Sequence, residues 1–533
     1  MEASSVPPRR RLSVNTAIFA VATAISRIVG LAREVIANAL FGQGIQASAF
    51  TIASQIPNLM SNLFAQAALS AAFVPVFTDL LEQGKRREAF RLASSLFWVI
   101  LLVLGAITLV GIALAGVVLP ALGGDSFDGD LAGLLTQIMF PVVLVLGLTG
   151  LLVGVLQSYD QFTLAALAPV VWNAVIVALL LTLHHDFHHG IEAYAIAWLA
   201  ATVVQMLLIV YALRSIDFRL SFTLDWHDPR VRRVFVLMLP VTVGLGIVNL
   251  DALINTSFGT LVTSGPRGGG PRAIQNAFLI YMMPQGIFSV AVTTVLFPTL
   301  SRQAARRDPA AMRHTLANGM RQINLLLIPA AVGLLLLAVP IVRLLFEHRA
   351  YTHADTLECA LALRWFAVSL PFSGINLLMT RTFFALQRPW IPTRLAAINM
   401  TVDVIVSLAL YRPFGVAGLV IGTASANIVM TYLQFQRLRT GFNGRLELAQ
   451  TMMITARILV AALLMGAIAR GVWVLANRVT GDSVPGQLVS VGLAVVLAGA
   501  FYAWAVLRMR IPEAGQVQEL VRARLRGRTT ASL

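Results

Sequence analysis

Long apolar stretches alternate with short polar segments along nearly the whole chain. A helix needs about 20 mainly apolar residues to cross a bilayer, and on this criterion the pattern predicts fourteen transmembrane helices. Their centres lie near Ile25, Leu63, Leu104, Leu144, Val175, Val203, Gly246, Val290, Ala331, Leu370, Val404, Ala424, Leu464 and Val495. The predicted fold class is therefore an all-α polytopic membrane protein, in which the stretch around Leu63 is long enough to be bent.

The composition supports this class and excludes others. Of the 533 residues, 58% are hydrophobic and 12% are charged, whereas a soluble protein carries about 25% charged residues. Cys359 is the single cysteine, so an intramolecular disulfide framework is excluded. The net charge of +16 would suggest nucleic acid as the partner of a soluble protein. Here the basic residues lie in short loops between apolar stretches, and no nucleic-acid partner is expected.

The loops alternate in charge, which predicts the orientation of the chain. One set is basic and comprises residues 85–87, 214–233, 302–313, 388–394 and 437–445. The other set, at 123–130, 184–189 and 481–483, is acidic or histidine-rich. Because basic loops favour the cytoplasmic side, we expect the first set and both termini to be cytoplasmic. The basic C-terminal tail should then lie on anionic lipid.

Short matches indicate an internal repeat. The segment Phe73-Val74-Pro75-Val76-Phe77-Thr78 returns as Leu296-Phe297-Pro298-Thr299-Leu300-Ser301, and Val155-Leu156-Gln157 returns as Ala385-Leu386-Gln387. They predict six-helix lobes at 14–215 and 230–440 and two additional helices at 450–510, between basic tails at 1–13 and 511–533. Since both lobes have an even number of helices, they would share one orientation and hold a substrate between them.

Arg27 and Arg33 lie inside the first apolar stretch. An arginine at the centre of a membrane helix costs roughly 2.5–3.5 kcal/mol, so such residues usually face a bundle interior or a watery cavity. A guanidinium fork matches phosphate and pyrophosphate oxygens. The pair therefore predicts an anionic substrate handled inside the membrane. The alternative is that each guanidinium reaches an interface along its own side chain, with Glu34 beside Arg33.

Several motifs resemble one family along nearly the whole chain. Ser26-Arg27-Ile28-Val29-Gly30-Leu31-Ala32-Arg33-Glu34 is similar to the opening motif of the MurJ (MviN) lipid II flippases, and Ile56-Pro57-Asn58-Leu59, Pro284-Gln285-Gly286-Ile287-Phe288 and Phe383-Phe384-Ala385-Leu386-Gln387 resemble later ones. The resemblance implies two six-helix lobes around a cavity, and a groove for the lipid tail formed by the last two helices. It also implies export of the undecaprenyl-pyrophosphate-linked peptidoglycan precursor across the bacterial inner membrane.

Some positions depart from the family pattern. Charged residues common in the family are replaced around Ser48, at Ser61 or Asn62, at Gln66, and at Leu279 after Asn276-Ala277-Phe278. We expect substrate binding by Arg27 and Arg33, and a cavity lined by helices 1, 2, 7 and 8. The expected lining residues are Gly30, Ser48, Pro57, Asn58, Ser61, Asn62, Gln66, Asn276 and Pro284.

Carboxylates in the second lobe suggest a cation site. Asp251 and Asp403 lie in apolar spans, and Asn399 is four residues before Asp403 and hence on the same helix face. Oxygen ligands suit a hard cation, and some family members resemble this with a sodium site, to which Thr423 would contribute by position. The alternative is a hydrogen-bonded network that ties helices together. Sodium is the candidate coupling ion, and no other cofactor is expected.

Other chemistries find little support. The run His184 to His189 has metal-ligand residue types without the separated pairs of a structural zinc site, and we interpret it as a solvated loop. A Walker-type phosphate loop and a nucleophile–base pair are not apparent, so an enzyme is not expected. The prediction is a lipid II flippase working by alternating access, with membrane lipids and cell-wall synthesis enzymes as further partners. The alternatives are an exporter of another polyprenyl-linked glycan or a small molecule, and a non-transporting scaffold.

Overall fold

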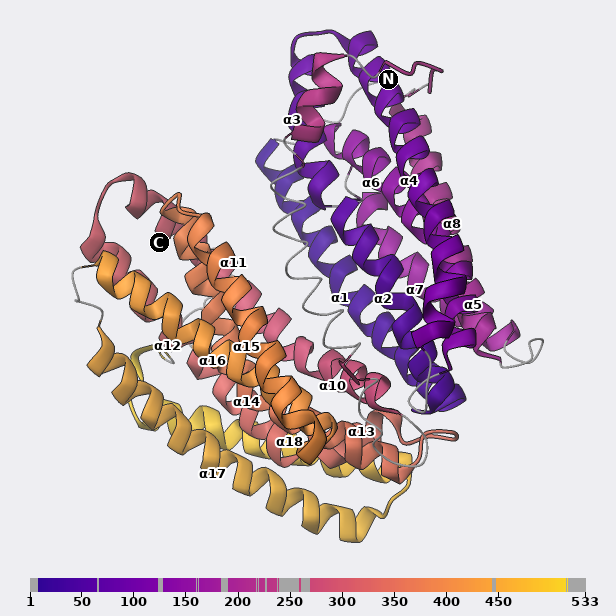
Figure 1. The fold of residues 1–533 in the computed structure, drawn as a ribbon. Helices are drawn as coiled ribbons and strands as arrows, with labels where there is room; N and C mark the ends of the chain where they lie inside the picture. Colours follow the sequence, from indigo (N-terminus) through magenta and orange to yellow (C-terminus); the bar gives the residue numbers. More distant parts are fainter. Residues whose placement is uncertain are drawn as a thin grey trace. The chain divides into compact units, whose positions relative to one another are not determined.

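The computed structural model describes residues 8–64, 67–122, 128–159, 161, 163–183, 190–216, 218, 220–225, 228–236, 238, 258–259, 269–442, 447–513 and 515. Within these ranges the secondary structure is helical, without a strand (Figure 1). Eleven segments are long and apolar enough to cross a membrane, and each contains one predicted span centre. The all-α polytopic fold is confirmed. The centre near Gly246 lies outside the described residues, and the count of fourteen stays a prediction.

The chain forms two compact units, the first of which comprises Met1–Arg272 and His348–Tyr351. Its described helices are α1 (Pro8–Phe41), α2 (Ile45–Phe64), α3 (Ala67–Glu82), α4 (Arg86–Leu122), α5 (Gly129–Met139), α6 (Pro141–Ser158), α7 (Thr163–Leu183), α8 (Ile191–Leu213) and the 3-10 turn η1 (Arg214–Ile216). Helix α1 packs against α7, and α7 packs against α8. These three helices carry most of the residues of the site described below.

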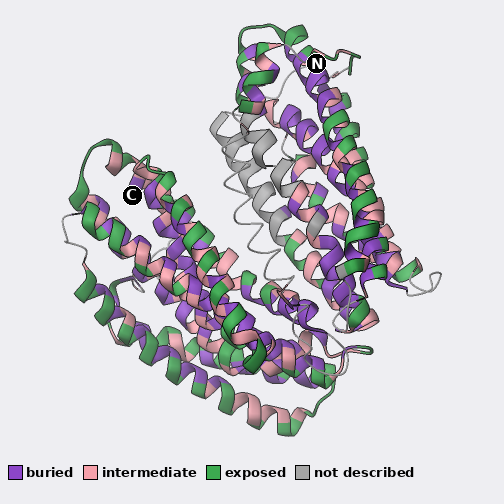
Figure 2. Ribbon diagram, in the orientation of Figure 1, coloured by how far each residue is buried: buried purple, intermediate pink, exposed green. Residues whose placement is uncertain are grey.

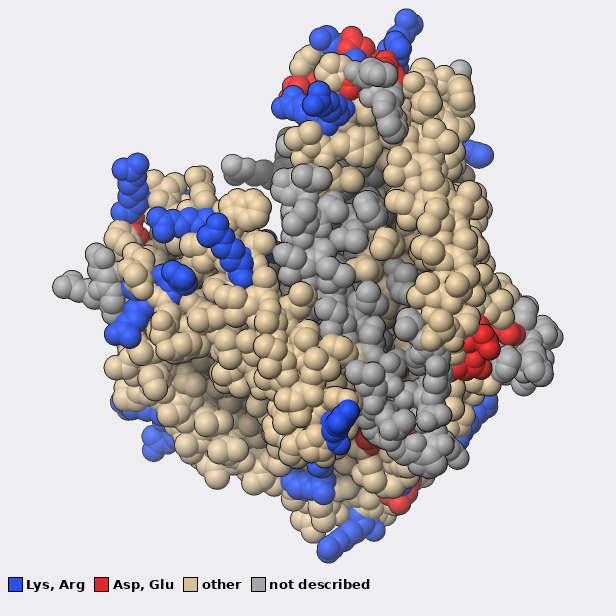
Figure 3. Space-filling model, viewed as in Figure 1, with Lys and Arg blue, Asp and Glu red and all other residues tan. Residues whose placement is uncertain are grey.

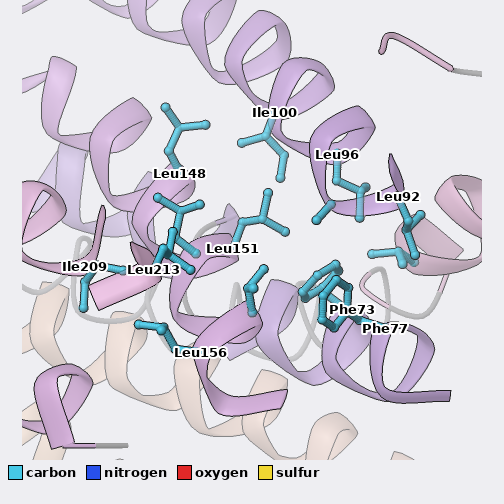
Figure 4. Packing of buried hydrophobic residues seen from close by; sticks show 14 of the residues in the cluster. Phe73, Phe77, Leu92, Leu96, Ile100, Leu148, Leu151, Leu156, Ile209 and Leu213 are labelled. Atoms are coloured by element: carbon cyan, nitrogen blue, oxygen red, sulfur yellow. The ribbon is translucent and has the colours of Figure 1, made fainter. Parts of the chain in front are cut away.

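Local sequence explains where the helices of the first unit begin. Asp128 caps α5 by accepting a hydrogen bond from the Leu131 N–H at 3.0 Å, and Pro141 occupies the first turn of α6, where its missing N–H costs nothing. The fourth predicted span thus consists of two helices in succession. A cluster of buried side chains around Phe73, Phe77 and Leu151 joins α3, α4, α6 and α8 (Figure 4).

The second unit comprises Ala273–Glu347 and Thr352–Leu533. Its described elements are α10 (Gly270–Pro284, whose first three residues belong to the first unit), the π-helix η2 (Gln285–Ser289), α11 (Val290–Ala305), α12 (Pro309–Leu336), α13 (Ala338–Phe346), α14 (His353–Ala385), α15 (Trp390–Phe414), α16 (Val416–Gly441), α17 (Leu448–Thr480) and α18 (Val484–Arg508). The last two helices pack against each other, and α17 packs along α12. The π-helix directly follows Pro284, as expected where a proline removes a helical N–H.

Large apolar side chains cover the outside of both units. On α17 and α18 they include Met452, Leu464, Val479, Leu488 and Val496, each more than 45% exposed. Figure 2 shows exposed positions along α17. On the visible face of each unit, charged side chains gather near helix ends and uncharged ones cover the middle (Figure 3). Such surfaces are stable against hydrocarbon but not against water, so both units belong to a multi-pass membrane protein.

Candidate functional site

Arg33 lies in a closely packed polar pocket of the first unit. Its Nη1 donates to Asn173 Oδ1 on α7 at 3.1 Å, and its Nη2 pairs with Glu34 Oε1 at 2.5 Å. The Arg33 side chain is 12% exposed. Its Nε is buried without a hydrogen-bond partner among the described residues. Both terminal nitrogens of the predicted fork are therefore already engaged with protein groups.

Glu34 is shared between two arginines. Its Oε2 accepts from Arg272 Nη2 at 2.9 Å, while Oε1 faces Arg33. Arg272 is 4% exposed, and its Nε donates to Asn38 Oδ1 at 3.1 Å. Two guanidiniums against one carboxylate leave a local excess of one positive charge. This excess makes the cluster a candidate site for an anion.

Aromatic side chains form one wall of the cluster. The Arg33 guanidinium carbon lies 4.9 Å from the centre of the Trp172 ring and 5.3 Å from that of Trp198, which is cation–π distance. Tyr194 stacks on Phe50 with ring centres 4.2 Å apart, and its hydroxyl lies 3.4 Å from Glu34 Oε1. The wall excludes water from one side of Arg33 and fixes the direction of its guanidinium.

Arg27 does not join this cluster. It is exposed on α1, and six residues separate it from Arg33, which places the two side chains about 120° apart around a helix. Gly30 lies between them, and a Cβ there would meet Asn173 Oδ1 at 3.5 Å, an ordinary contact. The structure therefore places Arg27 and Arg33 on different faces of α1, and their joint binding of one substrate stays a prediction.

The other predicted cavity residues are distributed over several elements. Ser48 and Pro57 are buried on α2, Asn58 is half-buried there, and Asn276 is 1% exposed on α10. Pro284 is half-buried at the end of α10. Ser61 and Asn62 belong to α2, but their side chains, Gln66 and the His184–His189 run lie outside the described residues.

The predicted cation residues are partly brought together in the second unit. Asp403 on α15 is 2% exposed, and it accepts hydrogen bonds from Ser407 at 3.1 Å and from Thr423 on α16 at 3.4 Å. Asn399 is half-buried one turn away on α15, and Asp251 lies outside the described residues. At Gly422, a Cβ would lie 2.8 Å from Asp403 Oδ1, so only glycine permits this close helix contact.

Arg272 is a site residue that no sequence motif indicated, and Glu34 stood out only as a neighbour of Arg33. A signal for Arg272 exists. It begins an apolar stretch on the predicted external side, where the positive-inside rule disfavours arginine. A basic residue kept against that rule is a candidate for a specific role.

Comparison with known proteins agrees with the resemblance of the motifs. The family model described as lipid II flippase MurJ matches residues 37–503. A probable lipid II flippase MurJ of Rhizobium meliloti (strain 1021) is 31% identical over 456 residues, covering 83% of this chain and 84% of the relative. The lipid II flippase MurJ of Burkholderia cenocepacia is 30% identical, covering 78% and 82%.

Solved structures share the fold. A structure of the lipid II flippase MurJ in an inward closed conformation matches with a TM-score of 0.75 at 22% identity, covering 92% of this chain and 99% of that one. An inward-facing conformation of a multidrug resistance MATE family transporter matches with a TM-score of 0.67 at 16% identity, covering 81% of this chain and 97% of that one. At these identities the likeness concerns the fold alone.

Proposed function

The chain belongs to the MurJ family of lipid II flippases, and from this premise we propose that it moves lipid II from the inner to the outer leaflet of the bacterial cytoplasmic membrane by alternating access. Family membership supports a lipid-linked saccharide as the substrate. Within the first unit, one observation carries the proposal, namely the buried cluster in which Arg33 and Arg272 share the Glu34 carboxylate.

The Glu34 carboxylate holds the positions at Arg33 and Arg272 that a pyrophosphate would take. A carboxylate and a phosphate both present oxygens to guanidinium N–H groups, and charge-assisted pairs of this kind are the stronger hydrogen bonds. A pyrophosphate carries more negative charge than the single Glu34 carboxylate. We therefore infer that the substrate competes with Glu34 for Arg33 and Arg272. The unpartnered Arg33 Nε is a further donor for it.

This competition provides a way to couple binding to a change of conformation. A ligand shifts a conformational equilibrium only if it binds the two states with different affinity. Breaking the ion pair between Glu34 and an arginine costs less free energy when a pyrophosphate is present to replace the Glu34 carboxylate. The state in which the arginines pair with Glu34 would thus be favoured without substrate. The state in which they bind the pyrophosphate would be favoured with substrate.

The direction of transport needs an energy source. Both termini and the basic loops would be cytoplasmic. Transport to the outer leaflet moves the negative charge of the substrate outward across the membrane potential, which is worth about 2.3 kcal/mol per charge at 100 mV. A sodium ion held by Asp251, Asn399, Asp403 and Thr423 would supply a second source. Asp403 is the anionic ligand of that set within the described residues, and its two hydroxyl partners are compatible with a hard cation.

Complementation of a bacterium depleted of its own lipid II flippase tests the proposal. The wild-type chain should restore growth, and an Arg33→Ala variant present at the same membrane level should fail. Failure of a well-expressed wild-type chain would instead favour an exporter of another polyprenyl-linked glycan or a scaffold for wall-synthesis enzymes. These two are separated by whether Arg33→Ala alters the level of any lipid-linked saccharide in the host.

A further inference from the structure

A row of polar side chains crosses the second unit between α14 and α16, which pack against each other. On α16 its members lie on one helix face, at spacings of four, four and three residues. From the first to the last of them α16 rises about 16 Å, or about half of a hydrocarbon core of about 30 Å. Polar side chains inside a membrane span are costly and usually functional. We call this row the polar seam, and it consists of Asn376 and Thr380 of α14 and Thr423, Asn427, Thr431 and Gln434 of α16.

Hydrogen bonds connect the polar seam to Asp403. Thr423 donates to Asp403 Oδ2 at 3.4 Å, and the Thr423 carbonyl accepts from Asn427 Nδ2 at 3.1 Å. Asn376 Nδ2 donates to the Asn427 carbonyl at 3.1 Å, and Asn376 Oδ1 accepts from the Thr431 hydroxyl at 2.7 Å. Polar contacts therefore continue without a break from the Asp403 carboxylate into the middle of α16.

In the predicted orientation the polar seam ends near the cytoplasm. Gln434 Nε2 donates to Thr380 at 2.9 Å, and Gln434 Oε1 is buried without a hydrogen-bond partner among the described residues. Hydrogen bonds that only hold two helices together would not leave a buried acceptor open, whereas a passing cation needs such an oxygen. Leu438 follows on the same face and is buried, so an apolar side chain closes the seam there. Arg437 at this level is exposed to solvent, which screens its charge.

Close helix contacts shut the other side of Asp403. A Cβ at Gly418 would overlap the Leu410 carbonyl oxygen, and a Cβ at Gly422 would overlap Ser407 Oγ. Ser407 and Leu410 follow Asp403 on α15, so in the predicted orientation these contacts lie on its external side. Asp403 thus has polar neighbours towards the cytoplasm and tightly packed backbone towards the outside. An ion held at Asp403 would leave more easily along the polar seam than between α15 and α16.

We propose that a sodium ion bound at Asp403 leaves for the cytoplasm along the polar seam, with Leu438 as the gate. The inference rests on the proposed function, in which sodium is a source of energy, and adds the exit route of that ion. Hydroxyl and amide oxygens suit a hard cation, and because they are uncharged the ion binds each of them weakly enough to move on. A proton is a poorer occupant because amide side chains have no titratable group to relay it. Sodium that moves inward along this route would drive the lipid outward.

Release of radioactive sodium from the purified full-length protein, followed after dilution into unlabelled sodium, tests the proposal. Asn427→Leu keeps the size of the side chain but removes its polar atoms from the polar seam. Because a residue on the route alters how fast the ion moves and not how tightly Asp403 holds it, release should slow by about tenfold, with the dissociation constant unchanged. Leu438→Ala should speed release. Asn324→Leu is the matched control because Asn324 is also buried and joins two helices, through Thr455 on α17. It lies outside the polar seam, and this variant should release sodium at the wild-type rate.

Three results would overturn the route. The first is release from Asn427→Leu at the wild-type rate. The second is a dissociation constant that changes in step with the rate, which is the result expected if these hydrogen bonds only hold the helices together. The third is absence of sodium binding by the wild type. Should Asn427→Leu fail to fold, Gln434→Leu allows the same measurement at the cytoplasmic end. The wild-type chain can restore growth in each of these cases because the membrane potential remains as an energy source, so failure here is distinct from failure of the proposed function.

The direction of the route is tested with Asn376→Cys in a Cys359→Ala background. A small cationic thiol reagent should label this cysteine in inverted membrane vesicles, where the cytoplasmic side is accessible, and should not label it from outside intact cells. Leu378→Cys is the control because Leu378 is buried on the same helix, two residues away, and this cysteine should stay unlabelled. Labelling of Asn376→Cys from the outside only, or equal labelling of both cysteines, would contradict a route to the cytoplasm along the polar seam.

Discussion

Glu34 Oε2 accepts a hydrogen bond from Arg272 Nη2 at 2.9 Å, which joins residues 238 positions apart in the chain. The contact closes a cluster that begins with the adjacent pair Arg33–Glu34 on α1. A carboxylate between two arginines cannot be removed without leaving like charges close together. Replacement of Glu34 should therefore lower the stability of the cluster and raise its affinity for an anion.

Loss of the carboxylate should destabilise the protein more than loss of one arginine. Glu34→Ala leaves both Arg33 and Arg272 without their common partner, whereas Arg272→Ala leaves Glu34 paired with Arg33. Removing one partner of a buried pair costs about 3–5 kcal/mol, and we expect Glu34→Ala to approach this range. Thermal unfolding of the purified variants gives the order, and an Arg272→Ala protein that unfolds at the lower temperature would contradict this account of the cluster.

Arginine geometry should matter as much as charge at position 33. Arg33→Lys keeps the charge but cannot contact Asn173 and Glu34 at the same time with a planar fork. Growth of a flippase-depleted strain should be restored only in part by Arg33→Lys and not at all by Arg33→Ala. Immunodetection in membranes controls for expression. Full growth with alanine at both 27 and 33 would refute the assignment of these arginines to the substrate.

The Asp403 cluster should respond to sodium if it binds the coupling ion. We expect sodium, but not potassium, to raise the unfolding temperature of the wild type, and Asp403→Asn to abolish this difference together with transport. Ser407→Ala is a useful comparison because it removes one hydroxyl donor to Asp403 and keeps the carboxylate. If the wild type responds equally to both ions, Asp403 is a structural residue and coupling depends on the membrane potential.

Acid should weaken the attachment of α17 to α12. Burial raises the pKa of Glu447, but its contacts with His314 and Arg321 together lower the pKa by more than burial raises it. The pKa of Glu447 therefore lies below the ordinary 4.5. Because the folded protein then binds this proton less readily than the unfolded chain, stability is lost as the pH falls from about 4.5 downwards. Unfolding temperatures measured between about pH 6 and pH 3 should fall less in Glu447→Gln than in the wild type. Parallel curves would exclude this contribution.

The orientation of the chain can be tested with single cysteines in a Cys359→Ala background. We expect a membrane-impermeant thiol reagent added outside to label a cysteine at position 126 and not one at position 85. The basis is the charge alternation of the loops. Labelling of position 85 from outside in intact cells would reverse the predicted topology, whereas permeabilised cells provide the control that the position is reactive.

Eleven of the spans could be predicted from the sequence because crossing a bilayer requires a length and an apolar composition that a few polar residues do not mask. The centres near Leu104 and Val495, for example, both fall within described helices. The partners of the Arg33–Glu34 pair were harder to predict because Asn173 lies 140 positions from Arg33 and Arg272 lies 238 positions from Glu34, and only tertiary packing brings them close. Arg27 and Arg33 lie on different faces of α1, since a spacing of six residues turns the side chains apart, and their binding of the substrate stays a prediction.

The most direct test of the central claim is transport of lipid II by the purified protein in vesicles. A fluorescent lipid II in both leaflets is bleached by a reagent that cannot cross the membrane, and the fraction protected in the inner leaflet is followed over time. We predict that the wild type makes the protected fraction accessible, whereas Arg33→Ala vesicles behave like vesicles without protein. Equal rates for the wild type and Arg33→Ala, or no transport by folded wild-type protein under sodium gradient and membrane potential, would contradict the account.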